Sequence, residues 1–183
     1  EEDALRAEAL LHVGHAELMR GRFAEAHAAL EECIALARAQ GRRRILAEAL
    51  GRLGRAVLDE GRHEESRGPF EESLSVAREL GNTTAVLFAT NQLGLVEYFA
   101  GDLDDAERRL SSAVALARAE GNRLGEVTAL QGLGFVAEDR GELDVAAAAY
   151  REGLAAARGN CDRYGAARCL MLLGEVERKK GAD

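Results

Sequence analysis

The stretch from Asn91 to Leu110 reads NQLGLVEYFAGDLDDAERRL and is the most complete copy of a pattern that returns every forty residues. Its landmarks are a Leu-Gly pair at 93–94, then Gly101 and Ala106. The other copies of these landmarks are Val13-Gly14, Gly21 and Ala26; Leu53-Gly54 and Gly61; Leu133-Gly134, Gly141 and Ala146; and Leu173-Gly174 and Gly181. A fixed period of this length predicts stacked units, each of which needs its neighbours to bury a core.

The composition predicts that these units are helical. The 183 residues are rich in alanine, leucine, glutamate and arginine, with one proline and no tryptophan, and such residues favour helices. A glycine after each stretch supplies the left-handed conformation that commonly ends a helix. We therefore predict an all-α fold with helices at residues 3–20, 23–40, 44–60, 63–80, 84–100, 103–120, 124–140, 143–158 and 163–180.

The Leu-Gly pair, the glycine seven residues later and the small residue five further on resemble the tetratricopeptide repeat. The forty-residue period is most similar to the long form in MalT-like and other multidomain bacterial transcription regulators. The resemblance implies a right-handed α-solenoid of helix-turn-helix repeats, arranged as a single array. The expected parts are four full repeats at about residues 3–42, 43–82, 83–122 and 123–162, and one terminal helix at 163–181. Because the chain opens on Glu1 without an initiating methionine, we expect a segment of a longer protein.

One glycine lies inside each first helix, where glycine costs about 1 kcal/mol relative to alanine. A close approach of the two helices in a unit would compensate for that cost. We predict that the glycines face the small residues of the second helices. The glycines are Gly14, Gly54, Gly94, Gly134 and Gly174, and the small residues are Ala26, Ser66, Ala106 and Ala146.

Two further features concern the second helices. Pro69 follows Gly68 well inside the second helix of the second copy, and since proline lacks an N–H group, we predict a kink or a delayed helix start there. Four arginines recur near the ends of these helices, at Arg38, Arg78, Arg118 and Arg158. They could form a functional ladder, but we favour a structural role, because a cation in the last turn complements the helix dipole.

Charge and hydropathy limit the partners and the location. The net charge of −8 argues against direct nucleic-acid contact from this segment. No apolar run approaches the ~18 residues that span a bilayer, and nothing resembles a signal peptide. We therefore expect no membrane contact and a cytoplasmic protein.

The three cysteines suit a reducing compartment. Cys33 and Cys169 occupy positions that are small in the other copies, so we expect them to be packing residues. Cys161 replaces the loop glycines of the other copies, and we expect it to be exposed.

The chain lacks recognisable motifs for catalysis. No glycine-rich stretch ends in the Lys-Ser/Thr pair of a phosphate-binding loop. His12 and His15, with Glu8, could approach a metal from one helix, but no further ligand completes the set. We predict no catalytic residues, no metal site and no cofactor, and hence a protein that is not an enzyme.

The resemblance also implies which side chains line the concave surface formed by the first helices. These positions are Glu8, Leu11, His15, Leu18 and Met19; Glu48, Gly51, Arg55, Leu58 and Asp59; Phe88, Asn91, Leu95, Tyr98 and Phe99; and Thr128, Gln131, Phe135, Glu138 and Asp139. Aromatic residues concentrate in the middle of this surface. The predicted partner site comprises Arg55, Phe88, Asn91, Leu95, Tyr98, Phe99, Gln131 and Phe135. The alternative is that Tyr98 and Phe135 only fill gaps between helices.

The leading hypothesis is a protein- or peptide-binding module that serves as the sensing segment of a bacterial transcription regulator. One alternative is a peptide receptor of the quorum-sensing kind, in which Asn91 and Gln131 hydrogen-bond an extended peptide. Another is a structural scaffold for self-assembly. The last helix carries Leu170, Met171, Leu172, Leu173 and Val176. These residues are apolar on several sides of that helix, so homo-oligomers could form through it.

Overall fold

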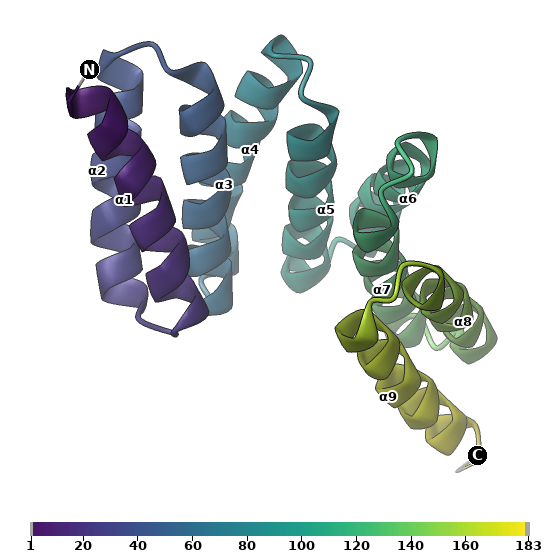
Figure 1. The fold of residues 1–183 in the computed structure, drawn as a ribbon. Helices are drawn as coiled ribbons and strands as arrows, with labels where there is room; N and C mark the ends of the chain where they lie inside the picture. The colour runs from purple at the N-terminus through teal and green to yellow at the C-terminus, as the bar shows by residue number, and fades with distance from the viewer. Residues whose placement is uncertain (1, 182–183) are drawn as a thin grey trace. The chain divides into compact units, whose positions relative to one another are not determined.

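The computed structural model describes the backbone of residues 2–181 and the side chains of residues 5–181. Every regular element in that range is an α-helix (Figure 1). The helices are α1 (Glu2–Met19), α2 (Phe23–Ala39), α3 (Arg43–Asp59), α4 (His63–Glu79), α5 (Thr83–Ala100), α6 (Leu103–Ala119), α7 (Arg123–Asp139), α8 (Leu143–Gly159) and α9 (Arg163–Lys180). The predicted all-α fold is confirmed, and each helix end agrees with its prediction to within one residue.

The helices group into two compact units, Glu1–Val96 and Glu97–Asp183, and the boundary falls inside α5. In the first unit α1 packs on α2, α2 on α3 and α3 on α4, while α1 also touches α3 (Figure 1). In the second unit α6 packs on α7, α7 on α8 and α8 on α9, while α7 also touches α9. Thus α1, α3 and α7 each contact the second helix of their own repeat, and α1 with α3 and α7 with α9 form the contacts between successive first helices.

The turns inside and between the repeats have one conformation. Gly21 shows it: its N–H donates to the Leu18 carbonyl at 3.0 Å, and the next N–H, of Arg22, donates to the Glu17 carbonyl at 2.9 Å. This pairing requires a positive φ at the glycine. The positive-φ glycines are Gly21, Gly41, Gly61, Gly81, Gly101, Gly121 and Gly141.

Cys161 adopts the same conformation, with a φ of 55°, and its thiol is exposed as predicted. A side chain with a Cβ is strained in this region. We therefore expect Cys161→Gly to raise the free energy of unfolding by about 0.5–1 kcal/mol, measured by urea denaturation. Cys161→Ala keeps the Cβ and serves as the control that leaves stability unchanged. Equal effects of the two substitutions would contradict a strained turn.

The other two cysteines are buried, as predicted. Cys33 donates from Sγ to the Ala7 carbonyl at 3.1 Å. Ser73, which occupies the same position one repeat later, donates from Oγ to the Ala47 carbonyl at 2.8 Å. The position is small because it packs directly on the backbone of the adjacent first helix.

Gly14, Gly54 and Gly134 mark close approach of the two helices in a repeat, but not to the predicted residues, whereas nothing described lies within 4 Å of a Cβ at Gly174. A Cβ added to Gly14 would lie 2.6 Å from Cγ of Leu30, and one added to Gly134 would lie 2.0 Å from Cε1 of Tyr150. At Gly54 the nearest atom is Cε1 of Phe70, at 2.8 Å. Each of these three glycines therefore makes a notch for a large side chain of the second helix. The small residues, four positions earlier, are not what the glycines face.

The prediction of a delayed start near Pro69 is wrong. Helix α4 begins at His63 and continues through Pro69 to Glu79. The steric conflict of proline in a helix falls partly on the Cβ of the preceding residue. Gly68 precedes it and has no Cβ, so the helical conformation before the proline is less crowded.

All four recurring arginines lie in the last turn of a second helix, as predicted. Two of them, Arg38 and Arg118, also bind a carboxylate of the next second helix. Arg38 Nη2 lies 2.8 Å and 2.6 Å from the two carboxylate oxygens of Glu72. Arg118 pairs in the same way with Glu152. Because both partners are largely exposed, each pair contributes at most about 1 kcal/mol.

Candidate functional site

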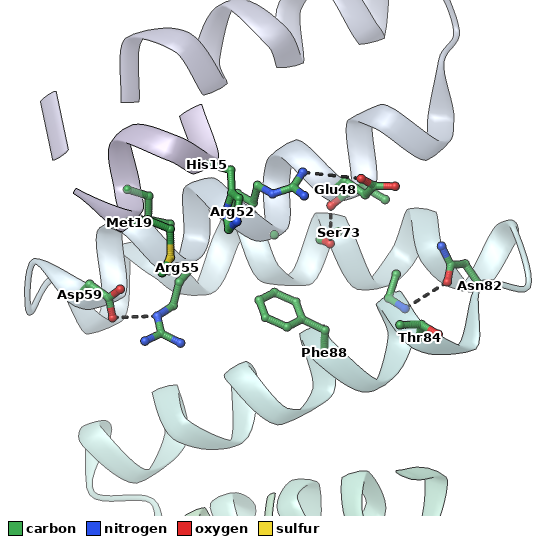
Figure 2. A pocket seen from close by; sticks show the side chains of 14 residues that line it. His15, Met19, Glu48, Arg52, Arg55, Asp59, Ser73, Asn82, Thr84 and Phe88 are labelled. Carbon is green, nitrogen blue, oxygen red and sulfur yellow. Dashed lines mark hydrogen bonds and ion pairs between the residues drawn. The ribbon is translucent and has the colours of Figure 1, made fainter. Parts of the chain in front are cut away.

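The first unit contains a cavity of about 600 Å³. Its walls come from α1, α3 and the first half of α5, and Ser73 of α4 forms part of its floor (Figure 2). The lining residues are His15, Leu18, Met19, Ala47, Glu48, Gly51, Arg52, Arg55, Asp59, Ser73, Asn82, Thr84, Ala85 and Phe88. The cavity therefore lies where three successive first helices face one another.

Gly51 explains why a hollow exists at this point. The equivalent positions in the other repeats hold Leu11, Asn91 and Gln131, all with long or branched side chains that are buried. A Cβ at Gly51 would lie 3.2 Å from Cε1 of Phe88. The missing side chain thus lets the Phe88 ring, which points toward α3 in Figure 2, lie against the α3 backbone, and the cavity remains beside the ring.

The apolar part of the cavity is made by Leu18, Met19 and Phe88. Phe88 is 40% exposed, and its ring centroid lies 6.3 Å from that of the fully buried Phe70 in an edge-on arrangement. Met19 is 75% exposed. Phe88 is therefore held on one side by the core and presents its other side to the cavity.

Two arginine side chains that line the cavity lie beside carboxylates. Arg55 Nε donates to Asp59 Oδ1 at 2.7 Å, whereas Arg52 Nη1 lies 3.5 Å from Glu48 Oε2. Burial lowers the pKa of His15, and the nearby charges of Arg52 and His12 add to the effect. His15 is therefore neutral at pH 7 and can offer both a donor and an acceptor.

The α5 side of the cavity supplies neutral polar groups. Asn82 Oδ1 accepts a hydrogen bond from the Ala85 N–H at 3.1 Å, which orients its NH₂ group as the remaining donor. Thr84 is exposed beside it. The cavity thus combines an apolar interior with a polar margin, the usual composition of a ligand pocket.

The eight predicted site residues divide between the two units. In the first unit, Arg55 and Phe88 line the cavity. Asn91 is only 6% exposed, and Leu95 is half-buried. Neither Asn91 nor Leu95 lines the cavity.

In the second unit, Tyr98 and Phe135 pack against each other with ring centroids 6.0 Å apart. Burial, together with the charge of Asp139, raises the pKa of Tyr98 to about 12. The packing of both rings favours the gap-filling alternative for Tyr98 and Phe135. Phe99 is 49% exposed, and its ring centroid lies 5.3 Å from that of Tyr98.

Gln131 is buried, and its Nε2 donates to Sγ of Cys169 at 3.3 Å. A ligand would have to displace that bond to reach the amide. Asn91 is buried as well. Neither amide is therefore exposed to hydrogen-bond an extended peptide, as the quorum-sensing alternative requires.

Sequence reasoning missed Arg52, Ser73, Asn82 and Thr84, which also line the cavity. Gly51 could have located the cavity from the sequence, because the equivalent groove positions in the other three repeats hold the larger residues Leu11, Asn91 and Gln131. Within residues 5–181, no three His, Cys, Asp or Glu side chains gather as a metal site would require. No helix in that range has the length and apolar character needed to cross a bilayer.

Solved structures with the same fold include two Rap proteins. The apo form of RapI is 15% identical with a TM-score of 0.83, and the match covers 93% of this chain and 62% of RapI. A Rap protein complexed with Competence and Sporulation Factor is 19% identical with a TM-score of 0.78, covering 97% of this chain and 55% of the other.

A third similar structure is a signal transduction ATPase with numerous domains from Pyrococcus horikoshii, which has a tetratricopeptide repeat sensor. It is 16% identical with a TM-score of 0.78, and the match covers 94% of this chain and 26% of the other. This chain thus spans less than two thirds of the length of each of these three proteins. At these identities the likeness establishes the fold.

The family follows from the sequence itself. No curated protein sequence matches the chain. The profile of the tetratricopeptide repeat, in contrast, matches residues 5–79 and again residues 85–159, which together make up most of the chain. The chain therefore belongs to the tetratricopeptide-repeat family.

Proposed function

We propose that this chain is a peptide-binding module, and that the cavity between α1, α3 and α5 is its binding site. The observation that carries the proposal is the hollow at Gly51, which opens beside Phe88 within a cavity of about 600 Å³. That volume lies in the range of pockets that enclose small ligands or a few residues of a peptide.

The lining groups favour an extended peptide with an apolar side chain. The side chain would enter the hollow over Gly51 and contact Phe88, where it buries apolar surface. The Asn82 amide, the Thr84 hydroxyl and the imidazole of His15 supply donors and acceptors for a peptide backbone. Two similar structures support this ligand class, since their Rap proteins are complexed with Competence and Sporulation Factor and with the Phr* peptide.

The finer proposal is that the module senses its peptide as part of a cytoplasmic bacterial regulator of transcription and is not itself catalytic. The tetratricopeptide repeat sensor of the similar signal transduction ATPase supports a sensing role. On this proposal the cognate peptide changes the DNA affinity of the complete regulator. An affinity for operator DNA that is the same with and without the peptide would contradict it.

The binding proposal is tested by screening the purified chain against a display library of short linear peptides. Affinities of the enriched peptides are then measured by fluorescence anisotropy. Gly51→Leu places a side chain in the cavity beside Phe88. Because a Cβ there would lie 3.2 Å from Cε1 of that ring, the ring must shift, and circular dichroism checks that the variant is folded. We expect Gly51→Leu to weaken binding at least about tenfold, which corresponds to 1.4 kcal/mol.

Gly174→Leu is the matched control, because it introduces the same side chain on a first helix of the second unit, in open space. It should leave the affinity for these peptides unchanged. Failure to enrich any peptide, or enriched peptides that bind Gly51→Leu as well as the original chain, would refute the proposed site.

A further inference from the structure

One arginine in the wall of the cavity makes no hydrogen bonds. The Arg52 side chain is 26% exposed and lines the cavity between α1, α3 and α5. Its Nη1 is buried without a hydrogen-bond partner, and within residues 5–181 no group accepts a hydrogen bond from its guanidinium. Arginine has five N–H donors, and buried polar groups in proteins are nearly always hydrogen-bonded. The donors of Arg52 are therefore available to a ligand in the cavity.

The carboxylates near Arg52 are bound by other arginines. Glu48 Oε2 lies 3.5 Å from Arg52 Nη1, whereas Glu48 Oε1 accepts a hydrogen bond from Arg44 Nη1 at 2.8 Å. The other carboxylate that lines the cavity, Asp59, accepts a hydrogen bond from Arg55 Nε at 2.7 Å. These three arginines thus oppose two carboxylates. The cavity wall can accommodate one further negative charge, beside Arg52.

Arg52 also lies next to the apolar part of the cavity. It directly follows Gly51 on α3, and Figure 2 shows its guanidinium extended along the wall toward Glu48. Burial, and then the charge of Arg52, lowers the pKa of His15, so the guanidinium lies near the α1 wall. An apolar side chain beside Phe88 and an anion at Arg52 can therefore belong to one short peptide.

We propose that Arg52 binds a carboxylate of the peptide that enters this cavity, so that the module selects an acidic peptide. The inference rests on the proposed peptide binding at the same site. The carboxylate belongs to an Asp or Glu side chain or to the C-terminus of the peptide, because the planar guanidinium can donate two parallel hydrogen bonds to either. A carboxylate balances the one excess positive charge, whereas a phosphate would add up to two negative charges.

The test is a double-mutant cycle on the peptides enriched from the display library. Each labelled peptide is synthesised in two further versions, one with its Asp and Glu residues changed to amides and one with an amidated C-terminus. We expect one of these versions to bind the original chain at least about tenfold more weakly than its parent. Against Arg52→Met, both versions should bind within about twofold of the parent, because the partner of the carboxylate is gone.

Arg55→Met is the matched control, because Arg55 lines the same cavity but already donates to Asp59. The amide version should still lose about tenfold in affinity for this variant. Peptides whose amide versions bind the original chain equally well, or lose as much affinity for Arg52→Met, overturn the role of Arg52. If Gly51→Leu still weakens those peptides, peptide binding at the cavity stands. Failure to enrich any peptide overturns both.

The stability of the free chain gives a second readout that needs no peptide. Replacing a buried ionic group by an apolar one of similar volume is often neutral or stabilising. Arg52 has no hydrogen bond to lose, and Glu48 keeps the one from Arg44. We therefore expect Arg52→Met to melt at the same or a higher temperature, followed by circular dichroism. A clearly lower melting temperature would show that the fold requires Arg52 and would overturn the proposal.

Discussion

Gly134→Ala should lower the free energy of unfolding by about 3 kcal/mol, at the upper end of the usual cost of overpacking a core. The added methyl group would lie 2.0 Å from Cε1 and 2.4 Å from Cζ of Tyr150, so one of the two groups must move. Tyr150 is fully buried, and its hydroxyl donates to Glu138 Oε1 at 2.5 Å. The ring is also packed edge-on against Phe135 at 6.2 Å. These contacts prevent the ring from swinging aside at low cost.

Gly174→Ala is the matched control for this prediction. It makes the same substitution at the same repeat position, but in open space. Since alanine favours a helix over glycine, it should raise the free energy of unfolding by about 0.5–1 kcal/mol. Urea denaturation followed by circular dichroism measures both variants. If the two substitutions shift stability in the same direction, the notch is not what makes glycine necessary at position 134.

The regular part of this structure follows from the sequence because it depends on short-range rules. The forty-residue period predicted the helix ends to within one residue, since a residue in the left-handed conformation, usually glycine, follows each helix at a fixed place in the repeat. The packing partner of the internal glycines was not predictable in the same way. Ala26 and Leu30 are one helical turn apart and lie on the same stripe, so helical periodicity cannot say which of them faces Gly14.

The candidate site was less predictable because a cavity depends on what neighbouring helices leave unfilled. The groove positions carried over from the resemblance include most of the residues that line the cavity, among them His15, Met19 and Arg55. The partner site was predicted in the middle of the array because the aromatic residues concentrate there. Tyr98 and Phe135 instead pack on each other. The cavity lies beside Gly51, which has no side chain.

The second large effect concerns a buried carboxylate in the second unit. Glu126 lies in the first turn of α7, and its side chain is only 5% exposed. Its Oε1 accepts a hydrogen bond from Arg118 Nε at 2.8 Å, and its Oε2 accepts one from Arg123 Nη1 at 2.8 Å. Hydrogen bonds to charged groups are worth more than neutral ones, and a missing partner is costly when the group is buried.

We expect Glu126→Gln to lower the free energy of unfolding at pH 7 by about 2 kcal/mol. The amide keeps the size of the carboxylate but loses its charge, and its NH₂ group faces an arginine. Glu152→Gln is the control, because Glu152 pairs with the same Arg118 but is 55% exposed, so its loss should cost less than about 1 kcal/mol. Equal losses from the two substitutions would contradict a special role for the buried carboxylate.

The same carboxylate predicts a dependence on pH. Burial alone would raise the pKa of Glu126, but the hydrogen bonds from Arg118 and Arg123 outweigh it and hold the pKa below its usual value of 4.5. A folded-state pKa below the unfolded one means that the stabilisation is fully present above pH 4.5 and is lost as the pH falls through the folded pKa. Urea denaturation at a series of pH values should therefore show the original chain and Glu126→Gln converging in stability as the medium is acidified below pH 4.5. A difference that stays constant across that range would show that the carboxylate's charge does not contribute.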